Sequence, residues 1–337
     1  MLARLLKLSL LIFLAVGTRG TALAQQLTPL RVRLGDVAMQ KVPFLVAYDE
    51  GIYKKNGLDV DQFITPGAAE TVRRSGVAVP GEYVRDDSAP ISIGGGNGVV
   101  YGRSRNARAG DRVILASTAY IVHWQIVARP EFTRLEQLKG KRLGYSSPGA
   151  MTHFIALKLA QRMGWDPDQD ISLLEGALAL DTLRSGAVDA FIAYEIPRVM
   201  AMAEGYTVLT DLSDWKMPIA GSGVSTTRAW LKDNRETARR FIRSLVEAIA
   251  LLKKDKSVGT RAMKKWYGIP DSEQLSVMYD SDIDWIPQKP YPAVEGIQAA
   301  IDLYNNNELR NLKPADFIDD SFVKELDESG FIDSLYR

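Results

Sequence analysis

Glycine residues and one amide follow the predicted strand 91–93, a position where α/β proteins often bind ligands. The sequence there is Gly94-Gly-Gly-Asn-Gly98. Because Gly95 and Gly96 have no Cβ atom, a ligand can approach their backbone closely, and Asn97 can donate from its amide. The cluster lacks the Lys-Ser/Thr pair of a phosphate-binding loop. Its alternative role is an ordinary turn before a helix.

A second polar stretch, Ser146-Ser-Pro-Gly-Ala-Met-Thr-His153, lies between a predicted strand at 141–145 and a predicted helix at 154–163. Its hydroxyl groups can either cap the helix or donate to a ligand, because both roles use the same geometry. The candidate ligand contacts in this stretch are Ser146, Ser147, Thr152 and His153.

An acidic residue, Glu195, directly follows the apolar run 189–194. That run is typical of a parallel strand covered on both faces. A carboxylate facing a cleft would favour a ligand with an amine, an amidine or a ring N–H, through a charge-assisted hydrogen bond. The alternative is an acid that interacts with the dipole of its own helix.

Aromatic side chains gather near the same strand ends, at Tyr120, Trp124, Tyr194 and Trp215. Aromatic walls at a cleft would suit a planar or methylene-rich ligand, although aromatic residues in strands often belong to the core. His123 has the same two alternatives, ligand contact or a hydrogen-bonded core residue.

The elements that would position these residues begin with a β-α-β unit. Residues 30–34 and 58–63 alternate as half-buried strands do, and the helix that starts at 42–46 ends near Gly51. The loop 35–41 then lies at the carboxyl edge of a parallel sheet, where open α/β folds bind small molecules. Gln40 and Lys41, in this loop, are therefore candidate ligand contacts.

The same strand, turn and helix pattern repeats in the middle of the chain, which predicts two similar lobes. The expected boundaries are 25–119 with 221–337 for the first lobe and 120–220 for the second. After the chain returns to the first lobe, the sequence Asp233-Asn-Arg-Glu236 predicts a capping box before an amphipathic helix. The apolar face of that helix would pack on the core of the first lobe, or bind a partner helix or a membrane.

Composition excludes several classes of site. The 337 residues include two histidines and no cysteine, so disulfides, thiolate metal sites and a lipid-modified cysteine are excluded. With so few imidazoles, we predict no metal site, no cofactor and no catalytic residue. The net charge of +1 does not indicate a nucleic-acid-binding protein.

Residues 1–24 have the pattern of a secretory signal peptide. Arg4 and Lys7 precede an apolar stretch at 8–16, and Ala22 and Ala24 form a cleavage site. We therefore expect cleavage near Ala24 and a periplasmic protein. The alternative is an uncleaved anchor.

Four segments together resemble one family. They are Val46-Ala-Tyr-Asp-Glu-Gly-Ile-Tyr-Lys-Lys-Asn-Gly-Leu-Asp-Val-Asp61, Leu135-Glu-Gln-Leu-Lys-Gly-Lys-Arg-Leu-Gly-Tyr145, Leu183-Arg-Ser-Gly-Ala-Val-Asp-Ala190 and the helix after Trp230. In order and spacing they resemble the sulfonate, nitrate and taurine type of periplasmic substrate-binding proteins of ABC transporters. That group also holds binders of thiamine-pyrimidine precursors. The segment 73–87 departs from the family pattern.

The resemblance implies a two-lobed α/β fold of the type II periplasmic binding class, with mostly parallel sheets flanked by helices and two crossover hinge segments. It implies a monomeric receptor that binds a sulfonate-, nitrate-, pyrimidine- or aromatic-type ligand and delivers it to a membrane permease with a cytoplasmic ATPase. The alternatives are an enzyme like the thiamine-pyrimidine synthases and a periplasmic sensory module. Because cysteine is absent, Lys41 is expected to contact ligand or loop and to form no Schiff base.

Overall fold

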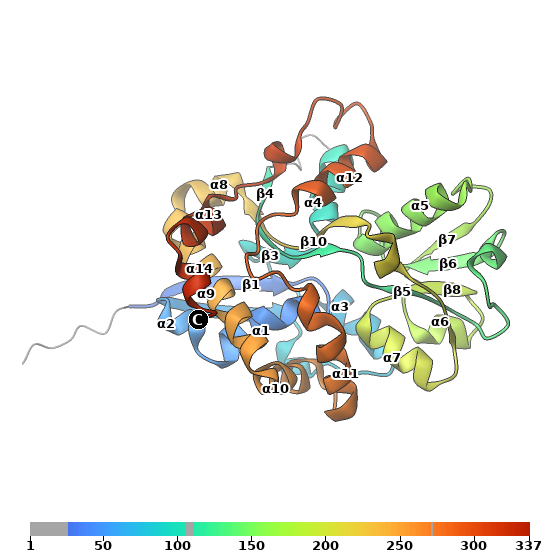
Figure 1. The fold of residues 1–337 in the computed structure, drawn as a ribbon, viewed down its shortest axis with the longest axis horizontal. Coiled ribbons are helices and arrows are strands. Elements are labelled where there is room, and N and C mark those ends of the chain that lie inside the picture. The colour runs from blue at the N-terminus through green and yellow to red at the C-terminus, as the bar shows by residue number, and fades with distance from the viewer. Residues whose placement is uncertain (1–25, 106–110, 271) are drawn as a thin grey trace, which may run out of the picture.

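The computed structural model describes residues 26–105, 111–270 and 272–337, which fold around two five-stranded sheets (Figure 1). The strand orders are β2-β1-β3-β10-β4 and β7-β6-β8-β5-β9. Each sheet has four strands in one direction and one antiparallel strand, β10 in the first and β5 in the second. The first sheet contains β1 (Thr28–Leu34), β2 (Leu58–Ile64), β3 (Ile91–Gly94), β4 (Arg112–Ile121) and β10 (Pro218–Thr227). The second contains β5 (Gln125–Ala128), β6 (Arg142–Tyr145), β7 (Ser172–Glu175), β8 (Ala190–Ala193) and β9 (Thr207–Asp211).

The chain crosses between the sheets twice. It leaves the first sheet at the end of β4 and enters the second at β5, then leaves β9 and returns at β10. We call the unit built on the first sheet the first lobe and the unit built on the second sheet the second lobe. The predicted fold class, two α/β lobes with mostly parallel sheets, is confirmed.

Helices cover both faces of each sheet, as a buried parallel sheet requires (Figure 1). In the first lobe, α4 and α12 lie on one face and α1, α9 and α10 on the other, while α5 lies opposite α6 and α7 in the second lobe. The first-lobe helices are α1 (Val42–Asp49), α2 (Ile52–Lys55), α3 (Pro66–Arg73), α4 (Gly96–Arg105), α8 (Arg228–Asp233), α9 (Arg235–Lys254), α10 (Lys256–Tyr267), α11 (Ser272–Asp282), α12 (Val294–Tyr304), α13 (Ser321–Glu328) and α14 (Phe331–Ser334). The second-lobe helices are α5 (Met151–Met163), α6 (Leu180–Arg184) and α7 (Glu195–Ala203), and 3₁₀ turns include Met39–Lys41 and Leu212–Trp215.

The predicted β-α-β start is confirmed. β1 pairs in parallel with β2, in register from Thr28 opposite Leu58 to Leu34 opposite Ile64. Gly51 follows α1 with a φ of 69°, a left-handed conformation that glycine adopts at little cost. The loop after β1 therefore lies at the carboxyl edge of the sheet, as expected.

The amphipathic helix α9 packs inside the first lobe. Its predicted apolar face is buried, and Phe241 stacks against Phe44 of α1 with ring centroids 6.1 Å apart. Core packing, one of the two alternatives, is thus confirmed. The predicted capping box is wrong, because Asn234 donates its amide back to Trp230 O, and Glu236 pairs with Arg239 and Arg240.

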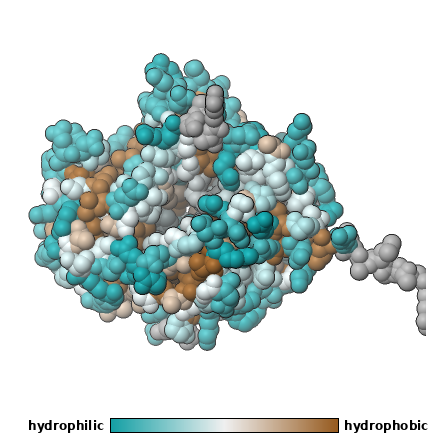
Figure 2. Space-filling view, turned by 180° about the vertical axis from the view of Figure 1, so that it is seen from behind, coloured by the Kyte–Doolittle hydropathy of each residue, from teal (hydrophilic) through white to brown (hydrophobic). Residues whose placement is uncertain are grey.

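Within the described residues, no helix combines the length and apolar composition needed to cross a membrane. The predicted signal peptide, 1–24, lies outside the described residues. On the face seen in Figure 2, hydrophilic residues cover most of the surface and the apolar patches are small and scattered. That face therefore offers no broad apolar surface.

Glycine allows α12 to approach the backbone of β10. A Cβ atom added to Gly296 of α12 would lie 1.9 Å from the carbonyl carbon of Ile219 and 2.1 Å from its oxygen. Backbone atoms cannot move aside as a flexible side chain can. Glycine at 296 therefore sets the distance between α12 and the strand that begins after the second crossing.

We expect Gly296→Ala to lower the free energy of unfolding by about 2–3 kcal/mol, because the added methyl group must push α12 off β10. The matched control is Gly102→Ala in α4, where a Cβ atom would meet nothing within 4 Å. Since alanine favours helix, this control should be neutral or stabilising by up to ~1 kcal/mol. Urea denaturation of both variants checks the prediction, and equal stabilities would contradict it.

Candidate functional site

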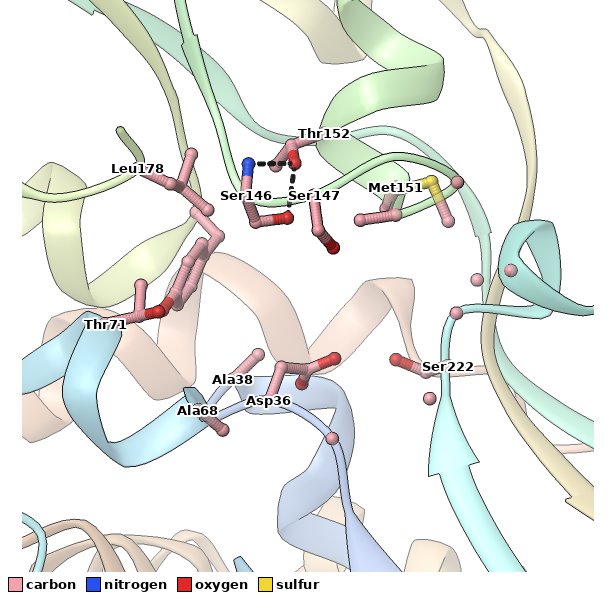
Figure 3. A pocket seen from close by; sticks show the side chains of 18 of the residues that line it. Asp36, Ala38, Ala68, Thr71, Ser146, Ser147, Met151, Thr152, Leu178 and Ser222 are labelled. Atoms are coloured by element: carbon pink, nitrogen blue, oxygen red, sulfur yellow. Dashed lines mark hydrogen bonds between the residues drawn. The ribbon is translucent and has the colours of Figure 1, made fainter. Parts of the chain in front are cut away.

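A cavity of about 520 Å³ lies between the two lobes, and we call it the interlobe cavity. The loop after β1, the N-terminal turns of α3 and α4, and β10 form its first-lobe wall. The loop after β6 and the N-terminal turn of α5 face them from the second lobe (Figure 3). The cavity thus lies at the carboxyl ends of parallel strands from both sheets, where open α/β sheets bind ligands.

The structure brings seven of the thirteen predicted ligand contacts to this cavity. They are Gln40, Gly95, Trp124, Ser146, Ser147, Thr152 and Tyr194. These residues come from both lobes and from the first crossing. Their role as ligand contacts stays a prediction, but they share one cavity.

The hydroxyl groups after β6 do not cap α5. The N-cap residue is Ala150, and Thr152 Oγ1 instead accepts from Ser146 N at 3.0 Å and lies 2.8 Å from Ser146 Oγ. The Ser146–Thr152 contact shapes the loop, and Ser147 is exposed at the cavity (Figure 3). The capping alternative is therefore wrong for these residues.

Two aromatic side chains form an apolar part of the wall. The rings of Trp124 and Tyr194 lie 5.8 Å apart and are tilted by 50°. Trp124 Nε1 is buried and has no hydrogen-bond partner among the described residues. Trp215 does not line this cavity and lies under Arg162.

Lys41, Gly96 and Asn97 support the cavity from behind and do not line it. Lys41 is fully buried, and its ammonium group pairs with Asp36 at 2.9 Å and donates to Ser222 Oγ at 2.7 Å. Asn97 Oδ1 accepts from Ala220 N, and a Cβ atom at Gly96 would lie 2.6 Å from Ala220 O.

Tyr120 and His153 are likewise not among the described residues that line the interlobe cavity. The Tyr120 hydroxyl lies 2.9 Å from the carbonyl oxygens of Lys289 and Tyr291. His153 Nδ1 accepts from Gly149 N at 3.1 Å, and burial lowers the pKa of its ring. Both side chains therefore have structural partners.

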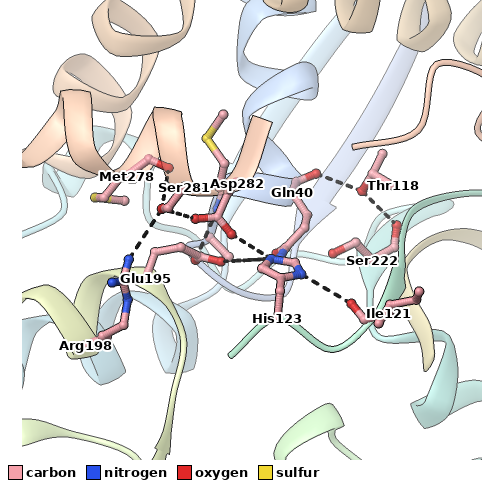
Figure 4. A network of polar contacts seen from close by, with 12 residues as sticks. Gln40, Thr118, Ile121, His123, Glu195, Arg198, Ser222, Met278, Ser281 and Asp282 are labelled. Carbon is pink, nitrogen blue, oxygen red and sulfur yellow. Dashed lines mark hydrogen bonds and ion pairs between the residues drawn. The ribbon is translucent and has the colours of Figure 1, made fainter. Parts of the chain in front are cut away.

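Glu195 enters a buried polar cluster next to the cavity, which we call the hinge cluster and define as Gln40, His123, Glu195 and Asp282 (Figure 4). His123 Nε2 lies 2.6 Å from Asp282 Oδ1 and 3.7 Å from Glu195 Oε1, and 3.0 Å from Gln40 Nε2. Glu195 is the first residue of α7 in the second lobe, and His123 lies on the first crossing. The cluster therefore joins both lobes at a crossing.

The protonation of the hinge cluster follows from burial and from ion pairing. Burial alone would lower the pKa of His123, but hydrogen bonds to Asp282 and Glu195 outweigh it and raise the pKa to about 10. Burial and the charge of Asp282 raise the pKa of the Glu195 carboxyl, against the effect of His123. His123 is therefore an imidazolium at neutral pH and donates to Asp282 and to Ile121 O.

The same three ionisable residues are of the types that bind metal ions, and their ligand atoms lie within 4.8 Å of one another. However, His123 Nε2 and Asp282 Oδ1 contact each other directly at 2.6 Å. A metal ion would have to replace the proton that they share. The arrangement is explained by an ion pair, and Gln40 Nε2 donates to Glu195 Oε1 at 3.4 Å.

Sequence reasoning missed Asp36, Thr71 and Ser222, which line the cavity. The sequence contained a pattern that could have identified Asp36 as a cavity residue, because Asp36 lies in the loop after the first predicted strand, one residue beyond Gly35. No sequence pattern identified Thr71 or Ser222, since a helix residue and a strand residue reach the cavity only through the packing of the lobes. The carboxylate that faces the cavity is thus Asp36, while Glu195 is not among the lining residues.

We predict that His123 stabilises the fold most at low pH. Its pKa is raised in the folded state above the ordinary 6.5, so the contribution is complete below about pH 6.5 and is lost as the pH rises toward 10. The difference in unfolding free energy between the wild type and His123→Gln should shrink from pH 6 to pH 9.5. Denaturant titrations across this range measure it.

His153→Gln is the matched control, because burial lowers the pKa of that histidine and it is already neutral above pH 7. Its stability difference from the wild type should stay constant between pH 7 and 9.5. A constant difference for His123→Gln over the same range would contradict the assigned ion pair.

Solved structures share the fold of this chain. The alkanesulfonate-binding protein SsuA from Xanthomonas axonopodis pv. citri is 14% identical with a TM-score of 0.64, covering 87% of this chain and 98% of its own. The nitrate-binding protein NrtA from Synechocystis PCC 6803 is 13% identical with a TM-score of 0.66, and the match covers 91% of this chain and 90% of NrtA. The desulfurization enzyme DSZB is 14% identical with a TM-score of 0.62, and the match covers 90% of this chain and 99% of DSZB.

At these identities the similarity shows the fold alone, and it matches the two-lobed architecture predicted from the sequence. No curated protein sequence matches the chain significantly. A family model described as NMT1/THI5 like matches residues 38–256, from the loop after β1 to the start of α10. The match covers more than half of the 337 residues, and the chain therefore belongs to the NMT1/THI5-like family.

Proposed function

We propose that the chain is the extracytoplasmic solute-binding component of an ABC import system, and that it captures a small organic molecule between its lobes. The observation that carries this proposal is the interlobe cavity, which both lobes line at the carboxyl ends of their parallel strands. The names of SsuA and NrtA, which share the fold, support it. The ligand classes that follow are sulfonate, nitrate, pyrimidine and aromatic compounds.

Contacts between the lobes support a closing motion. Arg74 of the first lobe pairs with Asp181 at 2.9 Å and donates to Gly176 O at 2.8 Å. On the other side of the cavity, the ring of His153 contacts the rings of Tyr101 and Tyr304. The structure therefore has the lobes in contact on two sides, as expected of a closed form whose hinges are the two crossings.

The chemistry of the cavity supports binding over catalysis. Among the described residues that line it, the side chains with an ordinary acid-base group are Asp36 and Tyr194. Burial raises the pKa of Tyr194 well above its usual range, so its phenol stays neutral. Such a lining provides donors, acceptors and aromatic surface. We therefore infer that the protein performs no covalent chemistry.

The wider assignment follows from the proposed function. We infer that the signal peptide is cleaved near Ala24, that the protein acts as a periplasmic monomer, and that it delivers its ligand to a permease with a cytoplasmic ATPase. The two crossings support lobe boundaries at 25–119 with 221–337 and at 120–220. Export and delivery need no contact with nucleic acid and no cofactor.

The proposal is tested with the purified protein without residues 1–24 and a thermal-shift screen of sulfonates, nitrate, aromatic acids, amines and pyrimidines. A ligand at 100 times its Kd stabilises the folded state by about 2.7 kcal/mol, so a true ligand raises Tm measurably. At least one compound should do so with a Kd below about 100 μM by calorimetry. If no compound of any class binds, the proposed function is wrong.

We expect Arg74→Ala to weaken the binding of a confirmed ligand by about three- to tenfold, because it removes contacts that hold the lobes together. Arg73→Ala is the matched control, since Arg73 pairs with Glu70 on its own helix. Calorimetry should give an unchanged Kd for that control. Equal Kd values for the wild type and Arg74→Ala would show that this contact does not contribute to closure.

A further inference from the structure

Among the described residues, one charged side chain lies in the wall of the interlobe cavity, and its charge is negative. Asp36 is 42% exposed at its side chain, and no Arg, Lys or His is among the described residues that line the cavity. Figure 3 shows the Asp36 carboxyl group pointing into the cavity from the first-lobe wall, across from Ser147. A ligand that enters therefore meets a carboxylate.

The positive charge next to Asp36 is out of reach of a ligand. The side chain of Lys41 is 0% exposed, and its ammonium group is held by Asp36 Oδ1 and Ser222 Oγ. An anion could reach Lys41 only by displacing the Asp36 carboxylate and desolvating its own charge. Lys41 instead fixes the position of Asp36 from behind.

Asp36 also has unused accepting capacity. Among the described residues, it accepts no hydrogen bond apart from its pair with Lys41. A carboxylate has about four lone-pair sites, and those on the cavity side are open to a ligand. Hydrogen bonds in which both partners are charged are the strong ones, so a protonated nitrogen is the preferred partner.

The rest of the wall fits an apolar or aromatic body. Trp124 and Tyr194 present aromatic surface, and Met151 and Leu178 add apolar side chains. The exposed hydroxyl of Ser147 leaves a donor for an acceptor group elsewhere on the ligand. The cavity wall thus combines a carboxylate with an apolar surface.

We propose that the ligand carries a protonated amine or an amidinium that pairs with Asp36, with an apolar or aromatic body against Trp124 and Tyr194. This inference rests on the proposed function and narrows its ligand class. It makes Asp36 the residue that sets specificity, and it excludes simple anions such as nitrate or a sulfonate without a nitrogen donor. A zwitterion with such a nitrogen belongs to the proposed class.

The test uses calorimetry with matched probes. Benzylamine, benzamidine and 4-(aminomethyl)benzoate carry the nitrogen, whereas benzoate, 4-methylbenzoate and benzenesulfonate do not. Any further hits of the thermal-shift screen are sorted by the same criterion. We expect the nitrogen-bearing compounds to bind at least tenfold more tightly than their matched anions.

Two variants isolate the Asp36 charge. Asp36→Asn alone would destabilise the fold, because it leaves Lys41 buried without its counter-ion, so the comparison uses Lys41→Met and the double variant Asp36→Asn with Lys41→Met. Both lack the buried ammonium, and they differ only at Asp36. The amine or amidine should keep or gain affinity in Lys41→Met and lose at least tenfold in the double variant.

Two results of these measurements would overturn the inference. If the compounds that bind all lack a nitrogen donor, or if the double variant binds amines as tightly as Lys41→Met, then Asp36 does not select the ligand. The proposed function survives both results, because a ligand has still bound. If no compound of any class binds, the proposed function and the inference fail together.

Discussion

The whole arrangement depends on the geometry of parallel strands, whose carboxyl ends meet at one edge of a sheet. Two such sheets face each other across the interlobe cavity, and in the described part of the chain the crossings between them follow the ends of β4 and β9. Loops after β1, β3, β6 and β8 must therefore converge on the same space. Once the two sheets form, binding groups distant in sequence become neighbours without any special local structure.

Close backbone packing lies next to the second crossing, at the start of β10. Gly96 of α4 lies against Ala220 of β10, and Gly296 of α12 lies against Ile219 and Ala220, so a side chain at either glycine would collide with the β10 backbone. Beside them, the hinge cluster connects the first crossing to the second lobe through Glu195. If the lobes close on a ligand as proposed, these rigid contacts would confine the movement to the crossings.

Much of the fold could be predicted from the sequence, because its signals are local. Alternation identified β1 and β2, and glycine ended α1 and α5 at Gly51 and Gly164. The site was predicted less well, since burial and pairing are tertiary properties. Glu195 follows a strand as a ligand-binding acid would, yet Met39 N, Gln40 and His123 bind its carboxylate, and Asp36 faces the cavity instead. No local pattern distinguishes these two acids.

The proposed function requires the two lobes to close around a ligand, and small-angle X-ray scattering of the protein with and without a compound that binds measures this closure. We expect a smaller radius of gyration for the ligand-saturated protein, with a scattering curve that matches the present closed arrangement. Identical curves for the two samples, at a ligand concentration where calorimetry shows saturation, would contradict the account.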